Sequence, residues 1–263
     1  MLLSILIPVY NERTVVERSL SLVLAAALPE NMDRELVIVD DCSTDGTSDI
    51  LKRMAGSDLR IRLYRHQVNQ GKGAAVRTAI ENAQGDFCLV QDADLEYDPQ
   101  EIPDVIAPIV NGNADVVFGS RFLVRKATRV LYFYHYLGNK LLTFLSNMAT
   151  NINLTDVETC YKAFRGDIIR QMRIESSGFG FEIEVTAKVA KLKCAIYETP
   201  ISYYGRTYEE GKKITGWDGV AALYYILRYN PMCSLKSSFY RMPKFGSDVS
   251  TGASREADGP AQN

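Results

Sequence analysis

The chain has 263 residues, of which 46% are hydrophobic and 24% charged, the composition of a soluble protein with one large α/β domain or two small ones. Its formal net charge of −2 gives no general electrostatic reason to bind nucleic acid, so any anion site has to be a local cluster of basic side chains. The five cysteines are widely spaced and form neither a C-x-x-C pair nor a zinc signature, which favours reduced thiols in a cytosolic protein.

The first nine residues are apolar but lack the basic leader and cleavage site of a secretory signal, so we interpret them as a buried first strand. No segment reaches the roughly 18 apolar residues that a transmembrane helix needs. We therefore expect a protein that is soluble or peripheral to a membrane.

The first half alternates between short apolar runs and helical patterns. We expect strands at residues 3–9, 35–39, 61–65, 87–91 and 116–119, separated by helices after Asn11, which can cap the first, and at 47–54, 74–83 and 99–110. This rhythm predicts an α/β fold with a mostly parallel sheet and helices on both faces.

The second half is less regular. Residues 129–149 form a helical pattern with a broad aromatic-rich stripe, either a core helix or an amphipathic element that dips into a membrane surface. Helices at 181–192 and 217–229 flank a strand at 195–199. From residue 237 the chain turns into Ser, Gly, Pro, Ala and charge, which predicts a domain over 1–236 and a disordered tail over 237–263.

Polar pairs follow several of the predicted strands. In open parallel sheets ligands bind beyond the carboxyl ends of the strands. We expect four clusters to meet there: Asn11 with Glu12, Asp40 with Asp41, Gly71 with Lys72, and Asp92 with Asp94. The Gly71-Lys72-Gly73 turn either lets Lys72 approach a ligand or simply begins a helix.

The triplet Asp92-Ala93-Asp94 ends the fourth apolar run. Residues two apart on a strand point to the same side, so both carboxylates project together. Two hard oxygen ligands suit Mg²⁺ or Mn²⁺ held together with a substrate diphosphate. About one Asp-x-Asp is expected by chance in such a chain, so the order of the surrounding segments carries the argument.

Five short motifs occur in an informative order: Pro8-Val9-Tyr10-Asn11-Glu12, the run 39–47, Asn69-Gln70-Gly71-Lys72-Gly73, Asp92-Ala93-Asp94 and Gly119-Ser120-Arg121-Phe122. They resemble the motifs of family 2 inverting glycosyltransferases, and most of all the dolichol-phosphate mannose synthase type, which glycosylates polyprenyl phosphates. Residues 155–164 and 198–203 are similar to its later segments, as is Arg206 with 211–213. That last loop is one residue longer here.

The resemblance implies a single-domain GT-A fold, a GDP- or UDP-hexose donor and a divalent metal, Mg²⁺ or Mn²⁺. Residues at matching positions would contact the nucleotide: Pro8, Tyr10, Glu12 and Asp40. Asp92 and Asp94 would hold the metal, and Asp92 would thereby contact the donor. Glu96 stands where the family often has Gln, and is either a third ligand or a solvated turn residue.

Mannose or glucose would be transferred to dolichyl or undecaprenyl phosphate. A phosphate monoester, with a second pKa of about 6, is largely anionic at pH 7 and needs positive charge rather than a base. The candidate phosphate-binding residues are Arg121, Arg129, Arg206, Lys212 and Lys213. A sugar hydroxyl would need a base, for which Asp156 is the candidate; otherwise Asp156 orients a lysine or the diphosphate.

Three other interpretations stay open at this point. One is a family 2 transferase that acts on a sugar hydroxyl in cell-surface polysaccharide or glycolipid synthesis. The others are a nucleotidyltransferase, although no Gly-rich loop follows the first strand, and a non-catalytic nucleotide-binding protein. We expect attachment to the cytoplasmic face of a membrane through 130–150 and nearby basic residues, alone, as a homo-oligomer or with a membrane partner protein.

Overall fold

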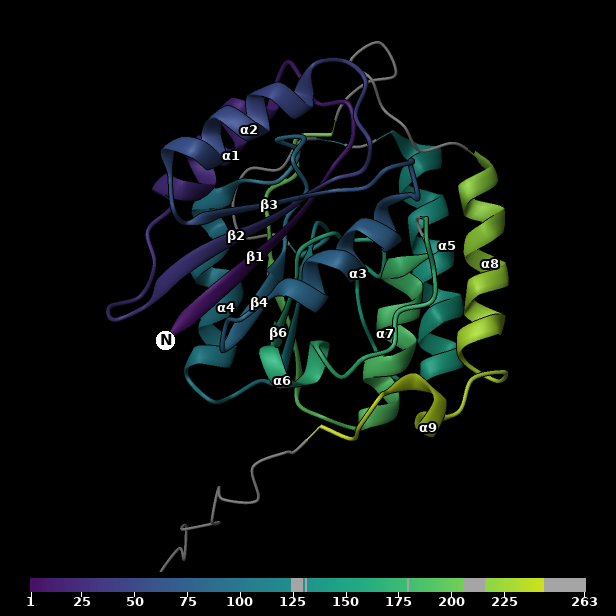
Figure 1. Cartoon of the computed structure of the whole chain (residues 1–263). Helices are drawn as coiled ribbons and strands as arrows, with labels where there is room; N and C mark the ends of the chain where they lie inside the picture. Colours follow the sequence, from purple (N-terminus) through teal and green to yellow (C-terminus); the bar gives the residue numbers. More distant parts are fainter. Residues whose placement is uncertain (124–129, 131, 179, 206–215, 244–263) are drawn as a thin grey trace, which may run out of the picture.

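The computed structural model describes residues 1–123, 130, 132–178, 180–205 and 216–243 (Figure 1). One sheet has the strand order β3-β2-β1-β4-β6-β5-β7. The strands are β1 Leu2–Val9, β2 Asp33–Asp40, β3 Ile61–Arg65, β4 Phe87–Val90, β5 Val116–Ser120, β6 Lys162–Arg165 and β7 Ile196–Pro200. The helices are α1 Val16–Ala25, α2 Thr47–Ser57, α3 Lys72–Asn82, the 3-10 turn η1 Pro99–Glu101, α4 Ile102–Val110, α5 Phe133–Thr150, α6 Gly166–Ile169, α7 Phe181–Leu192, α8 Gly216–Tyr229 and α9 Leu235–Ser238.

The sheet is mostly parallel, as predicted, with one reversed strand. Strands β3, β2, β1 and β4 pair in parallel, and β5 pairs in parallel with β7. Strand β6 runs antiparallel to both of its neighbours, β4 and β5. Strand β6 was not predicted, because it begins with a lysine and ends with an arginine and so is not an apolar run.

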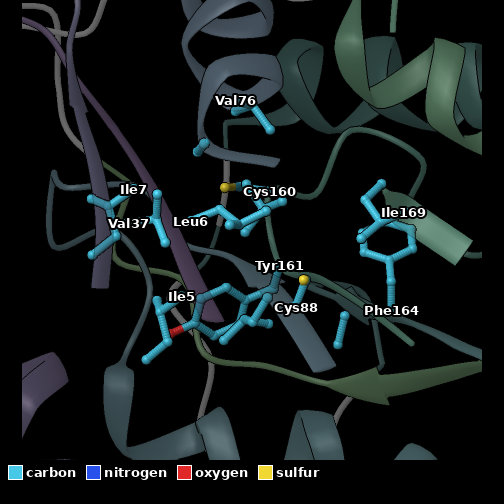
Figure 2. Packing of buried hydrophobic residues seen from close by; sticks show 14 of the residues in the cluster. Ile5, Leu6, Ile7, Val37, Val76, Cys88, Cys160, Tyr161, Phe164 and Ile169 are labelled. Atoms are coloured by element: carbon cyan, nitrogen blue, oxygen red, sulfur yellow. The ribbon is translucent and has the colours of Figure 1, made fainter. Parts of the chain in front are cut away.

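The core explains why the central strands are continuous apolar runs. Leu3, Ile5 and Ile7 of β1 are fully buried, and so is Leu6 between them, because helices cover both faces of the sheet. Figure 2 shows Ile5, Leu6 and Ile7 gathered with residues of neighbouring elements such as Tyr161. If the pairing register of β1 shifted by one residue, the side chains of its two faces would change places, but both faces are apolar and would stay buried.

The helices lie in front of the sheet, behind it and beside it. Helix α3 packs on β1 and β2, whereas α4 packs on β5, β6 and β7 (Figure 1). Helices α5, α7 and α8 contact one another and form a separate layer. The first nine residues of α7, Phe181 to Val189, are all buried, so α7 is an internal helix.

Two local expectations differ from the structure. Helix α1 begins at Val16, and Asn11 is not its cap; the Asn11 Oδ1 atom instead accepts a hydrogen bond from the Thr44 N–H at 2.8 Å and joins the loops after β1 and β2. At the other end, the expected boundary at residue 236 lies inside α9, and Phe239 beyond it is 3% exposed. Residues 244–263 of the expected tail lie outside the described residues.

Candidate active site

The strand directions bring distant segments to one edge of the sheet. Strands β1, β2, β3, β4, β5 and β7 all end at this edge, and the antiparallel β6 begins there. The segments that meet are therefore the loops after residues 9, 40, 65, 90, 120 and 200, together with the loop before residue 162. This convergence was predicted for the first half of the chain, and the structure adds the later loops.

Lys72 lies between two carboxylates. It is the first residue of α3, and its Nζ atom is 3.0 Å from each carboxylate oxygen of Asp92 and 2.8 Å from Glu182 Oε1. Burial opposes the positive charge, but Asp92 and Glu182 outweigh it and raise the pKa of Lys72 well above its usual value. Lys72 is therefore a fixed cation at the sheet edge.

The two glycines on either side of Lys72 allow the start of α3 to pack closely against another loop. A Cβ atom on Gly73 would meet the carbonyl oxygen of Ser176, and one on Gly71 would meet that of Ser177. Gly71 also has a φ of 91°, a conformation that favours glycine. The turn does begin a helix, and its glycines let α3 approach the 176–178 segment.

Asp94 and Glu96 form the turn after β4. Asp94 Oδ1 accepts a hydrogen bond from the Glu96 N–H at 3.0 Å, and Leu95 between them has a φ of 63°. Glu96 Oε2 accepts a hydrogen bond from the Tyr203 hydroxyl at 3.0 Å. The turn thus joins the acidic triplet to the segment that follows β7.

The donor atoms of the triplet suit a hard divalent ion. Asp92 and Asp94 are both half-buried, and each supplies carboxylate oxygens, which Mg²⁺ and Mn²⁺ prefer. In the described part of the chain, no three His, Cys, Asp or Glu side chains form a metal-binding group. Asp92 and Asp94 would therefore hold an ion together with substrate oxygens, and a third ligand at Glu96 stays a prediction.

Arg121 and Asp156 form a buried ion pair. The Arg121 Nε atom donates to one Asp156 carboxylate oxygen at 2.6 Å, and a terminal nitrogen donates to the other at 2.7 Å. The same nitrogen also donates to Asn139 Oδ1 at 3.1 Å, and the guanidinium lies 5.1 Å from the centre of the Tyr203 ring. The Arg121 guanidinium is therefore held in one orientation.

The environment of Asp156 bears on its two predicted roles. Burial disfavours its charge, but Arg121 lowers the pKa of the Asp156 carboxyl below its ordinary value. A fully buried carboxylate that is held by an arginine and has a lowered pKa is a poor general base. The geometry favours an orienting role, and the group it orients is Arg121 rather than a lysine.

The predicted nucleotide-binding residues lie at the same edge. Asp40 is 1% exposed and accepts hydrogen bonds from the Ser43 N–H at 2.9 Å and from the Ser48 hydroxyl, so it shapes the turn after β2. Tyr10 is 37% exposed, whereas Glu12 is 7% exposed. Pro8 is half-buried near the end of β1. Their contacts with a nucleotide stay predictions.

Some site residues were not predicted, and some predicted ones are not described. Glu182, Tyr203 and Asn139 were not among the predicted site residues, and they become neighbours of Lys72 and Arg121 only through the fold. An acid in the first turn of an apolar helix was the available signal for Glu182. Four predicted phosphate-binding residues lie outside the described residues: Arg129, Arg206, Lys212 and Lys213.

Helix α5 exposes an apolar face beside this site. Five of its exposed side chains recur every three or four residues: Tyr134, Leu137, Leu141, Phe144 and Met148. Phe133 and Tyr136, in the first turn, are exposed as well. The neighbouring α8 exposes Leu223, Tyr224 and Leu227. The single charged residue of α5, Lys140, turns inward, with its Nζ atom 3.2 Å from the Thr155 carbonyl oxygen and 4.3 Å from the centre of the Phe122 ring. We call the aromatic face the set of five exposed α5 residues and three exposed α8 residues: Tyr134, Leu137, Leu141, Phe144, Met148, Leu223, Tyr224 and Leu227.

None of the described helices is both long and apolar enough to cross a bilayer. The opposite side of α5 is packed, since Thr143 and Ser146 are buried. Helix α5 is therefore neither a membrane span nor wholly a core helix.

The fold is the GT-A type found in solved glycosyltransferases. The structure of glucosyl-3-phosphoglycerate synthase from Mycobacterium tuberculosis, determined with Mn²⁺, uridine diphosphate and phosphoglyceric acid, superposes with a TM-score of 0.67 at 17% sequence identity. The match covers 87% of this chain and 78% of that one.

Residues 4–173 match the model of glycosyl transferase family 2, and the chain belongs to this family. An undecaprenyl-phosphate mannosyltransferase of Micrococcus luteus is 30% identical over 83% of this chain and 90% of its own length. A dolichol-phosphate mannosyltransferase of Pyrococcus furiosus is 28% identical over 81% of this chain, which spans 59% of that protein. The chain is thus a family 2 glycosyltransferase.

Proposed function

We propose that this enzyme transfers a hexose, mannose or glucose, from a nucleotide sugar to a polyprenyl phosphate, with inversion at the sugar carbon and with Mg²⁺ or Mn²⁺. The observation that carries the proposal is the placement of two kinds of charge at one sheet edge. The carboxylates of Asp92 and Asp94 follow β4, and the oriented guanidinium of Arg121 follows β5. The two carboxylates suit a metal–diphosphate leaving group, and the guanidinium suits an anionic acceptor.

The leaving-group side consists of Asp92, Asp94 and Lys72. When bound, the metal would act as a Lewis acid on the departing diphosphate. Lys72 would add a second positive charge in a site that is largely shielded from water. The mycobacterial synthase supports this assignment, because its structures contain Mn²⁺ with uridine diphosphate or with uridine-diphosphate-glucose.

The acceptor side favours a phosphate over a hydroxyl. A phosphate monoester brings its own negative charge and needs a cation that holds it in line. The Nε atom and one terminal nitrogen of Arg121 are bonded to Asp156 and Asn139, so Arg121 would hold the phosphate through its other terminal nitrogen. A hydroxyl would need a base, and Asp156, the predicted candidate, is committed to Arg121. The names of the Micrococcus and Pyrococcus relatives, both transferases to polyprenyl phosphates, point the same way.

The aromatic face gives the enzyme a means to reach a lipid acceptor. An uncharged helix face rich in tyrosine and leucine suits the interface between water and acyl chains. Arg125, Lys126 and Arg129 precede α5 in the sequence and would add attraction to anionic headgroups. We therefore infer peripheral attachment to a membrane through α5 and α8.

The decisive experiment is a transfer assay. The protein is incubated with Mg²⁺ or Mn²⁺, a panel of GDP- and UDP-hexoses and a short polyprenyl phosphate, and the product is identified by mass. We expect a hexosyl polyprenyl phosphate, and we expect Asp94→Asn to reduce its rate by about 10²-fold or more, because charge on the leaving group is no longer stabilised.

Asp49→Asn is the matched control, since the Asp49 side chain on α2 is 84% exposed and distant in the chain from the triplet. Its rate should equal that of the wild type. Transfer to sugar hydroxyls alone would replace the proposed acceptor, and unchanged turnover in Asp94→Asn would remove the metal from the proposal.

A further inference from the structure

The carboxylate of Glu182 lies on the far side of Lys72 from the predicted metal site. Its Oε1 atom is 2.8 Å from Lys72 Nζ, and its side chain is 4% exposed. Lys72 Nζ is at the same time 3.0 Å from both oxygens of Asp92. The ammonium thus occupies the Asp92 carboxylate on which a divalent ion would depend.

Helix α7 holds the backbone around Lys72 as well as its ammonium. Glu184, two residues after Glu182, accepts hydrogen bonds from the Glu175 and Ser176 N–H groups, both at 2.8 Å. The fully buried Lys188 pairs with Glu184 at 2.5 Å. The segment fixed in this way is the one on which Gly71 and Gly73 pack. The Ala74 N–H donates to the Ser177 carbonyl oxygen at 3.2 Å, which ties the start of α3 to this segment, so we assign the movement of the lysine to its side chain.

Glu182 has room for one more hydrogen bond. Its Oε2 atom is buried and finds no hydrogen-bond partner among the described residues. Buried carboxylate oxygens are normally satisfied, and an exception calls for an explanation. An ammonium has three donors on a flexible stem, so Lys72 can supply the missing bond after a small shift away from Asp92.

We propose that Glu182 is a positioning residue that gives the Lys72 ammonium two resting places. In one, Lys72 bridges Asp92 and Glu182, as in this structure; in the other, it rests on Glu182 alone while a divalent ion takes Asp92. The inference rests on the proposed function, because it takes Asp92 as a metal ligand. Without Glu182, two cations would compete for one carboxylate and repel each other at short range.

This arrangement would serve two ends. Lys72 keeps Asp92 neutralised before the metal arrives, so the site does not hold an unpaired, half-buried charge. After the metal binds, Glu182 retains the ammonium beside the place where the diphosphate charge develops.

The test measures metal binding alone, without donor or acceptor. Mn²⁺ is titrated into the purified full-length protein, and free Mn²⁺ is followed by its electron paramagnetic resonance signal. We expect Glu182→Gln to weaken Mn²⁺ binding by about fivefold or more, because Lys72 then stays on Asp92. The double variant Lys72→Met with Glu182→Gln should bind Mn²⁺ at least as tightly as the wild type, since the competing cation is gone.

The double variant separates positioning from folding. If Glu182 were only structural, adding Lys72→Met would not restore the affinity lost in Glu182→Gln, and that result would overturn the inference. Glu81→Gln, an exposed carboxylate on the same helix as Lys72, is the control and should leave the affinity unchanged. Melting curves of every variant check that each one folds.

The wild type and Asp94→Asn separate the two proposals. Mn²⁺ uptake that Asp94→Asn abolishes but Glu182→Gln leaves intact overturns this inference and supports the metal site. If the wild type takes up Mn²⁺ only when GDP or UDP is present, the same variants are compared with that nucleotide added, against a protein-free control. Uptake that is absent from the wild type both with and without the nucleotide, or that is insensitive to Asp94→Asn, overturns the metal part of the proposed function, and this inference falls with it.

Discussion

The two halves of the molecule use buried charge in different ways. In the first half, carboxylates at strand ends accept hydrogen bonds from backbone N–H groups of nearby loops. Asp41 is the clearest case, with the Gln70 and Gly71 N–H groups at 2.9 and 2.7 Å and His66 Nδ1 at 2.6 Å. In the second half, buried charges also pair with each other, as Arg121 with Asp156 and Lys188 with Glu184. The first half has a comparable acid in Glu35, but the arginine that it pairs with, Arg62, is 30% exposed.

The difference separates two tasks. Carboxylates that bind backbone groups fix the shapes of loops, which suits a nucleotide site made of turns. Paired charges hold cations at chosen places, which suits a site for anions. Lys72 links the two halves, because it belongs to the first half of the chain and pairs with Glu182 of the second half.

The largest expected effect on stability comes from breaking an ion pair in the second half. Asp156→Asn leaves the Arg121 guanidinium buried without its counter-charge, and we expect the free energy of unfolding to fall by about 3–5 kcal/mol. Asp45→Asn, in the first half, keeps one acceptor oxygen and replaces the other, so it removes the acceptor for either the Thr47 or the Arg13 N–H group and should cost only about 1 kcal/mol. Urea unfolding measures both, and equal losses would contradict the distinction between the halves.

The next effect is a dependence on pH. Burial, and then the charge of Glu182, raises the pKa of Glu158 from 4.5 to about 7, and its buried Oε1 atom has no hydrogen-bond partner in the described structure. Between these two pKa values the folded state binds more protons than the unfolded state, so the stability falls as the pH rises through this window.

Glu158→Gln removes that dependence. As the pH rises from 4.5 to 8, the free energy of unfolding of the variant should increase relative to that of the wild type by up to about 3 kcal/mol. Urea unfolding at several pH values gives the difference. Parallel curves for the two proteins would show that the pKa of Glu158 is the same in the folded and the unfolded protein, which would contradict the prediction.

A smaller effect tests the contact between the halves. Gly73→Ala places a methyl group against the Ser176 carbonyl and should lower the free energy of unfolding by about 1–3 kcal/mol. Gly56→Ala is the matched control within α2, because a Cβ there meets nothing within 4 Å. It should stabilise the protein by about 0.5–1 kcal/mol. A neutral Gly73→Ala would mean that the 176–178 segment does not press on α3.

The features that the sequence could predict lie mostly in the first half of the molecule. Strands β1, β2 and β4 were found because they are apolar runs that end in polar pairs, and parallel pairing alone places those ends together. Strand β6 was missed because Lys162 is buried by tertiary contacts, its Nζ atom bonding the Val157 carbonyl at 3.0 Å. The pairs of Arg121 with Asp156 and of Lys72 with Glu182 join residues distant in the chain, so local periodicity carries no trace of them.

The smallest effect on stability is expected on the aromatic face. Leu141 and Phe144 are 55% and 59% exposed, so changing both to serine removes little buried surface and should shift the free energy of unfolding by about 0.5 kcal/mol or less. The same change should abolish flotation with anionic vesicles that contain polyprenyl phosphate, because these side chains would enter the acyl boundary. Leu59→Ser, at a fully exposed leucine between α2 and β3, is the control and should float like the wild type. If the double variant floats as well as the Leu59→Ser control, this face does not drive attachment. A face that contributes almost nothing to folding yet stays free of charge is best explained by a second environment in which it is buried, and only a measurement in that environment can detect its contribution.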